Sequence, residues 1–240
     1  DLEGRSGLRE FDHERSRREK VMANPELDNY VKPMVFENLA TPSMQTLALS
    51  MIDRLEWRHH GIGVLQGYVR EHCEPEVRIH VWSRRLLKPG MDLSGDVHDH
   101  RFDMVSHVLV GCVLHVEWNA FATPDGDHTM MTLTHARAAV DTHYHGPTTP
   151  LGGRYAVEKK LYKIEQGFSY RFQAQRFHRS PLPTENVTVT CVEKHQQREA
   201  AARLLYPISR EPVMAFGHTP DPEVVREVLA EAKERLEQGL

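Results

Sequence analysis

The chain has 240 residues, of which 40% are hydrophobic and 27% are charged, a composition typical of a globular protein with a sizeable core. The formal net charge is −4, and acidic residues interrupt the basic runs, so no nucleic-acid partner is indicated. No stretch approaches the 18 apolar residues of a membrane span, and the N-terminus is polar, so we expect a cytoplasmic protein with no membrane partner. Three cysteines far apart in the sequence argue against a disulfide framework.

The first 60 residues are predicted to form an N-terminal extension with one amphipathic helix at about 42–58. Thr41 and Pro42 suit the start of a helix. The apolar residues that follow repeat at helical spacing: Met44, Leu47, Ala48, Met51, Ile52 and Leu55.

Short alternating runs begin at residue 61, and Gly, Pro, Asp and Asn clusters separate them. The expected strands are 63–70, 77–86, 105–118, 129–139, 156–164, 168–172 and 187–193. Short strands at regular spacing are typical of a β-sandwich or β-barrel, so we expect an all-β core over 61–195. A helical C-terminal extension is expected over 196–240, with its last helix starting at Asp221-Pro222.

The most specific local feature is His98-Asp99-His100. Side chains two apart on a strand point to the same face, so His98 and His100 can bind one metal ion. A third imidazole from a neighbouring strand, His178, would complete a three-histidine site. Histidine ligands accept Fe, Ni, Co, Zn or Cu, so the residues alone leave the identity of the divalent metal open.

The spacing around these histidines resembles the two motifs of the cupin superfamily. In the first motif, three residues separate His100 from Met104, and six more separate Met104 from Gly111. Met104 stands where the family has a glutamate ligand. The second motif runs from Gly167 through Gln173-Ala174-Gln175 to His178, with glutamines where the family has Pro and Gly. The resemblance implies a cupin-type β-barrel (a double-stranded β-helix or jelly roll) whose metal ligands are His98, His100 and His178.

Within the cupins, the missing glutamate resembles the thiol dioxygenases of the cysteine dioxygenase type. Tyr68-Val69-Arg70 is similar to the Tyr-x-Arg segment whose guanidinium binds the substrate carboxylate in that family. The resemblance implies an Fe(II) cofactor, O₂ as co-substrate, and a small carboxylate-bearing thiol or amino-acid-like substrate. It further implies Arg70 as the catalytic residue that orients the substrate, with Tyr68 and Met104 lining the substrate site. Asp99, on the opposite face of its strand, is interpreted as a structural anchor.

Several residues depart from that family. Thr190 and Val192 occupy positions where its outer histidine and tyrosine would fall, so cysteine itself is not indicated as the substrate. An apparent insertion at about 119–154 between the motifs contains His143 and His145, a second same-face pair suited to a surface or a substrate lid. The other candidates for the carboxylate-binding role of Arg70 are Arg78, Arg84 and Arg85.

The sequence therefore predicts an enzyme, a mononuclear non-haem Fe(II) oxygenase of the dioxygenase type. One alternative is a redox-neutral metal-dependent cupin (an isomerase, lyase or cyclase), although no general base stands out. Another is a cupin that binds a metal or small ligand without catalysis. A homodimer is compatible with the sequence, and the roles of the first 40 residues and of the insertion stay open.

Overall fold

The computed structural model describes residues 34–37, 41–60, 63–87, 97–133, 148–182, 187–209 and 219–239. The chain divides into two compact units, 1–32 and 33–240, and every described residue belongs to the second. His143 and His145 of the expected insertion lie outside the described residues.

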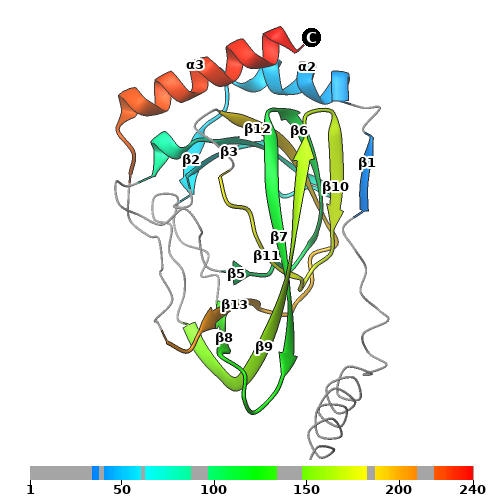
Figure 1. Ribbon diagram of the computed structural model, residues 1–240. Helices are drawn as coiled ribbons and strands as arrows, with labels where there is room; N and C mark the ends of the chain where they lie inside the picture. The colour runs from blue at the N-terminus through cyan, green and yellow to red at the C-terminus, as the bar shows by residue number, and fades with distance from the viewer. Residues whose placement is uncertain are drawn as a thin grey trace, which may run out of the picture. The chain divides into compact units, whose positions relative to one another are not determined.

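Two groups of strands form the barrel (Figure 1). Seven strands pair in the order β1-β10-β6-β12-β4-β3-β2. Their bounds are β1 Met34–Glu37, β2 Trp57–His60, β3 Val64–Arg70, β4 Glu76–Trp82, β6 Asp103–Val110, β10 Phe168–Phe172 and β12 Thr188–His195. Six more close into a ring in the order β11-β5-β13-β8-β9-β7. Their bounds are β5 Val97–His98, β7 Cys112–Ala122, β8 His128–Leu133, β9 Thr148–Glu165, β11 Phe177–Arg179 and β13 Ala202–Pro207. From β4 to β7 and from β9 to β12 the chain alternates between the two groups, as in a jelly roll.

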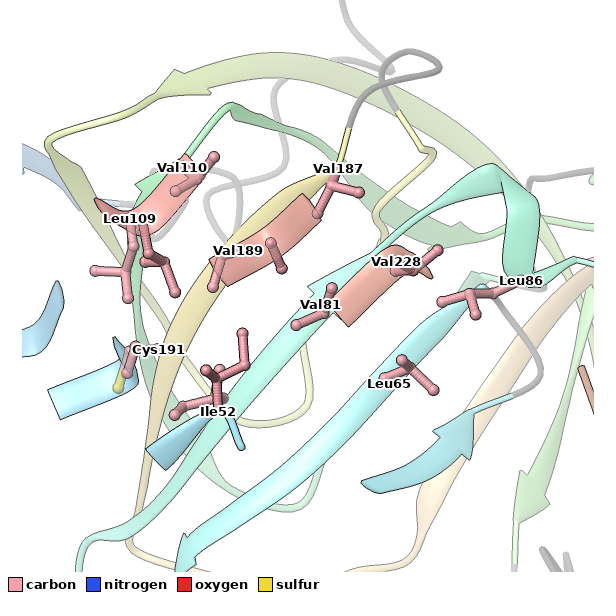
Figure 2. Packing of buried hydrophobic residues seen from close by; sticks show 14 of the residues in the cluster. Ile52, Leu65, Val81, Leu86, Leu109, Val110, Val187, Val189, Cys191 and Val228 are labelled. Carbon is pink, nitrogen blue, oxygen red and sulfur yellow. The ribbon is translucent and has the colours of Figure 1, made fainter. Parts of the chain in front are cut away.

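Two helices cover one face of the seven-stranded sheet, α2 (Thr41–Met51) and α3 (Pro222–Gln238). In Figure 1 the two helices lie side by side over this sheet. Asp221 is the N-cap of α3, and its side chain accepts a hydrogen bond from the Glu223 amide at 2.8 Å. Figure 2 shows the apolar cluster between the helices and the sheet. Its fully buried members include Ala48, Ile79, Val81, Leu109, Val189, Val228 and Leu236.

The alternate residues of the seven-stranded sheet face the six-stranded group instead. A second apolar cluster joins the two: Met104, Val108, Val113, Ile164, Tyr170, Phe172 and Val192. We call the space between the two groups of strands the barrel interior, and we call the side covered by α2 and α3 the helix face.

The predicted fold class is confirmed: the chain has an all-β barrel core with helices at both ends. The element boundaries differ from the expected ones. The helix expected at 42–58 ends at Met51, and Trp57–His60 is an edge strand. The strand expected at 105–118 is a hairpin around Gly111, whose φ of +76° suits glycine.

The sheets also extend beyond the expected limits of 61 and 195. β13 lies in a segment expected to be helical, because it pairs with β5 on one edge and with β8 on the other. Strand β9 likewise begins at Thr148, within the expected insertion. Among the described residues, no helix has the length and apolar character needed to cross a membrane.

Replacing Leu236 by Ala should lower the free energy of unfolding by about 2–5 kcal/mol. This side chain of α3 is 0% exposed where the helix packs on the sheet, so its removal leaves a cavity. Leu161→Ala is the matched control, since Leu161 is 64% exposed and its loss should change stability by less than about 0.5 kcal/mol. Urea denaturation of both variants measures the difference. Equal effects would contradict the packing of α3 on the sheet.

Candidate metal centre

Three histidine side chains converge in the barrel interior. His98 ends β5, His100 follows two residues later, and the antiparallel pairing of β11 with β5 sets His178 directly opposite His98. The ligand nitrogens of the three residues all lie within 4.8 Å of one another. The ring centroids are 4.7 to 4.9 Å apart. The structure therefore brings together the three residues that the sequence analysis selected.

The donor set suits a divalent metal ion. Nitrogens that bind one ion at about 2.1 Å lie at most about 4.2 Å apart, so small ring rotations would close the site. His178 Nδ1 lies 3.3 Å from the Arg176 carbonyl oxygen. Because a carbonyl only accepts, Nδ1 carries the proton and Nε2 is left as the ligand atom. Burial and then the neighbouring His98 lower the pKa of His100 and of His178 well below the ordinary value, which keeps both imidazoles in the neutral form that binds metal.

Asp99 anchors the backbone that carries the histidines. This buried carboxylate accepts hydrogen bonds from the Arg203 amide at 2.6 Å and from Arg203 Nε at 2.7 Å. Arg203 Nη2 also donates to the Gln175 carbonyl at 3.1 Å, and the Gln175 amide donates to the His100 carbonyl at 2.8 Å. Burial raises the pKa of Asp99, and the Arg203 guanidinium opposes that shift. These bonds tie β5, β13 and the turn before β11 together, in agreement with the interpretation of Asp99 as an anchor.

The turn before β11 contains a residue in an unusual backbone conformation. Gln175 has φ of +64°, in the left-handed region that glycine favours. It is the residue that the sequence comparison aligned with the glycine of the second cupin motif.

Apolar side chains surround the three histidines. The Phe102 ring stacks on His100 with centroids 4.7 Å apart, and the Phe172 ring contacts His178 at 4.4 Å. Met104 lies directly opposite Phe172 and belongs to the same buried cluster. Met104 thus lies in the barrel interior, and its expected role in lining a substrate site stays a prediction.

The structure separates Arg70 from the histidines. A β-bulge after Tyr68 sets Arg70 opposite Val77, whose side chain belongs to the cluster under the helices. Residues paired across a sheet share a face, so the exposed Arg70 lies on the helix-face side of β3. Tyr68, opposite Arg78, lies on the interior side. The bulge is the physical reason that the Tyr-x-Arg spacing does not bring both side chains to one site.

Two polar residues lie beside the histidines: Glu117, which was not predicted from the sequence, and His115, whose place in an expected strand left it open as a core or interior-facing residue. Glu117 of β7 lies opposite His178 and shares its face, with 7% exposure. His115, two residues earlier, is 0% exposed and its ring is 5.3 Å from that of His178. Neither ring nitrogen of His115 has a hydrogen-bond partner, and burial lowers its pKa to about 3. The signal for both was the period-two spacing of His115 and Glu117 within the strand expected at 105–118, which places the two side chains on one face.

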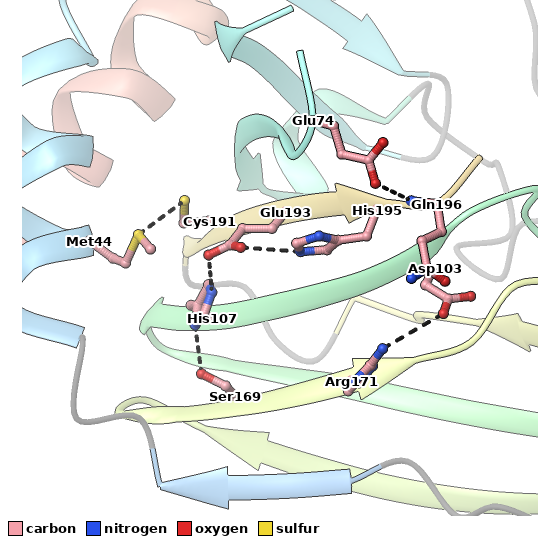
Figure 3. Close-up of polar contacts among 10 residues, drawn as sticks. All are labelled: Met44, Glu74, Asp103, His107, Ser169, Arg171, Cys191, Glu193, His195 and Gln196. Carbon is pink, nitrogen blue, oxygen red and sulfur yellow. Dashed lines mark hydrogen bonds and ion pairs between the residues drawn. The ribbon is translucent and has the colours of Figure 1, made fainter. Parts of the chain in front are cut away.

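Other histidines belong to a polar network on the helix face (Figure 3). His107 Nδ1 is 2.8 Å from Ser169 Oγ, and its Nε2 is 3.1 Å from a carboxylate oxygen of Glu193. The second oxygen of Glu193 is 3.2 Å from His195. His107 lies opposite Cys191, a member of the cluster under the helices, so this network is on the opposite side of the sheet from the metal centre.

Comparison with known proteins gives fold-level likeness alone. No family model and no curated protein matches the chain. Among solved structures, an RmlC-like cupin from Shewanella frigidimarina is 16% identical, with 60% of this chain and 87% of that chain covered and a TM-score of 0.33. A DMSP lyase from Ruegeria pomeroyi is 8% identical, with 80% and 94% covered and a TM-score of 0.37. A cupin 2 domain-containing protein from Halorhodospira halophila is 10% identical, with 86% and 96% covered and a TM-score of 0.32. At these identities and TM-scores the three structures indicate no substrate.

Protein purified without oxygen should contain nearly one divalent metal ion per chain, and His98→Ala and His178→Ala should lose it. Removing a ligand should weaken metal binding by more than the roughly 10- to 100-fold that loss of an outer hydrogen-bond partner costs. Elemental analysis gives the metal content. His72→Asn is the control, because His72 is exposed and Asn tolerates its φ of +60°. Metal retained in both alanine variants would contradict the three-histidine site.

Proposed function

We propose that the protein is a mononuclear non-haem Fe(II) oxygenase of the dioxygenase type, acting on a small carboxylate-bearing thiol or amino-acid-like molecule. The convergence of three histidines, with no carboxylate in the group, is the observation that supports this proposal. Three nitrogen ligands on one side of a six-coordinate ion leave three positions for substrate and oxygen. Bound Fe(II) would supply the one-electron chemistry that O₂ requires.

The protein's own residues would control access to that site. His98, His100 and His178 hold the ion, while Asp99 and the Arg203 side chain hold the strand that carries two of them. The Phe102, Met104 and Phe172 side chains form an apolar wall that keeps bulk water away from the reacting groups. Oxygen chemistry benefits from such a wall, because water competes for the open positions.

The second candidate is a redox-neutral metal-dependent reaction, and Glu117 is the observation that favours it. A carboxylate on the same face as His178, with the unpartnered His115 beside it, could accept a proton from a metal-bound substrate. The Nε2 atom of His115 is 3.9 Å from Oε1 of Glu117. This pair would supply the general base that a redox-neutral reaction needs.

Oxygen consumption separates the two candidates. Iron-loaded protein mixed with small thiol acids and amino acids should consume O₂ in proportion to product formed, and no product should form without O₂. A Clark electrode and mass spectrometry of the products measure this. Product formed at the same rate without O₂ would exclude the oxygenase.

In that second case Glu117→Gln should slow turnover by about 10²- to 10⁴-fold, the usual contribution of a general base. Glu158→Gln is the matched control, since Glu158 is an exposed residue of the adjacent strand β9. Equal rates in the two variants would remove Glu117 from the reaction.

A further inference from the structure

The seven-stranded sheet carries two partly buried cations on its interior face. Lys194 of β12 lies between Met104 and Glu76 on the neighbouring strands, and Arg78 of β4 lies opposite Val192. Because Met104 and Val192 belong to the interior cluster, Lys194 and Arg78 also point into the barrel interior. The Lys194 side chain is 12% exposed and that of Arg78 is 16% exposed, so both are partly accessible to solvent.

Arg78 and Lys194 share one carboxylate partner, Glu76. Arg78 Nε and Nη2 each lie 2.5 Å from Oε1 of Glu76, and Lys194 Nζ lies 3.1 Å from the same oxygen. In the part of the chain that the structure describes, Glu76 is the only hydrogen-bond acceptor that either cation contacts. A guanidinium has five N–H donors and an ammonium has three, so most of these donors are available to a further acceptor.

The electrostatics of this group favour an additional anion. Burial alone would raise the pKa of Glu76, but Arg78 and Lys194 outweigh it and lower that pKa, so the carboxylate is ionised. Burial and Arg78 lower the pKa of Lys194, although Glu76 opposes the shift. Two cations and one carboxylate carry a net charge of +1, and Arg101 adds to the positive field at Lys194. A buried excess charge is costly unless a counter-charge binds.

Aromatic rings hold the cations and connect them to the metal centre. The Arg78 guanidinium lies 4.3 Å from the Tyr68 ring centroid, and Lys194 Nζ lies 4.2 Å from that of Phe102. The Phe102 ring stacks on His100 at 4.7 Å, so the ammonium lies within about 9 Å of the His100 ring, the sum of 4.2 and 4.7 Å. A small molecule can span that distance.

We propose that Lys194 and Arg78 bind the carboxylate of the substrate, the role that the sequence analysis gave to Arg70. The metal-bound end of this substrate rests on the proposed function, whereas the carboxylate site does not. A planar guanidinium beside an ammonium suits a carboxylate, and a single negative charge balances the net charge of +1. The substrate is therefore a small carboxylate whose metal-binding group lies a few bonds from the carboxylate carbon.

The first experiment uses metal-free protein and acetate alone. Thermal melting at increasing acetate concentration gives the affinity, because a ligand that binds only the folded state raises the melting temperature. Lys194→Met and Arg78→Gln should weaken acetate binding about 10- to 100-fold, the effect of removing a charged hydrogen-bond partner. Arg70→Gln is the matched control and should leave the affinity unchanged. Glu76→Gln should tighten acetate binding, a gain that misfolding cannot produce.

The second experiment links this site to the metal. Cobalt-loaded protein, with occupancy measured for each variant, is titrated with mercaptoacetate and with 2-mercaptoethanol, and the thiolate absorption band of cobalt reports binding. The carboxylate should give mercaptoacetate at least about tenfold higher affinity in the unmodified protein and in Arg70→Gln. This preference should disappear in Lys194→Met while cobalt stays bound.

Each outcome bears on one of the two claims. Acetate binding that Lys194→Met removes supports the carboxylate site even if no cobalt binds, and then the proposed function alone fails. Equal affinity for the two thiols on cobalt-loaded protein, or a preference that only Arg70→Gln removes, overturns the carboxylate site. Phosphate that raises the melting temperature more than acetate does overturns the assignment to a carboxylate.

Discussion

The register between β5 and β11 is the constraint on which the site depends. It sets His178 opposite His98, and a shift of one residue would turn His178 away from the barrel interior. Both strands are short, two and three residues, so their own ladder hydrogen bonds cannot hold this register alone. The buried Asp99 supplies the missing restraint, because its two bonds to Arg203 tie β5 to β13, and Arg203 also reaches the turn before β11. The side chain of Asp99 and those of its neighbours His98 and His100 therefore point to opposite faces of the same short segment.

The two groups of strands contribute different chemistry to the barrel interior. The six-stranded ring provides the three histidines, with Glu117 and His115 next to them. The seven-stranded sheet provides the cations Lys194 and Arg78, and its other face is buried under α2 and α3. Because the helices remove that face from solvent, the sheet can place charged side chains on the interior side without losing its apolar core. A substrate between the two walls would meet neutral nitrogen ligands on one side and positive charge on the other.

Much of this arrangement follows from local sequence pattern. The alternation of apolar residues, the turn signals and the His-x-His spacing depend on neighbouring residues, and they predicted the strands, the flanking helices and the pair His98 and His100. The resemblance to the two cupin motifs, and not a local pattern, indicated His178 and the type of barrel. Arg70 shows the limit of such patterns. A β-bulge changes the face of the sheet toward which the following side chain points. No residue near Tyr68 is of a type that would have predicted the bulge. The faces of Lys194 and Glu117 depend on the strands with which β12 and β7 pair. A local sequence pattern cannot predict such pairing between distant residues, as for Glu76 and Lys194, which are 118 positions apart. Strand β13 was missed for the same reason.

Both functional proposals require that three imidazoles hold one metal ion in the barrel interior. X-ray absorption spectroscopy of the iron-loaded protein would identify the ligand atoms whatever the substrate is. We expect about three nitrogen scatterers with the multiple-scattering pattern of imidazole, completed by oxygen atoms of water, with one imidazole fewer in His178→Ala if any iron remains bound. A spectrum with fewer than three imidazoles, or with sulfur from Met104 or a cysteine, would contradict it.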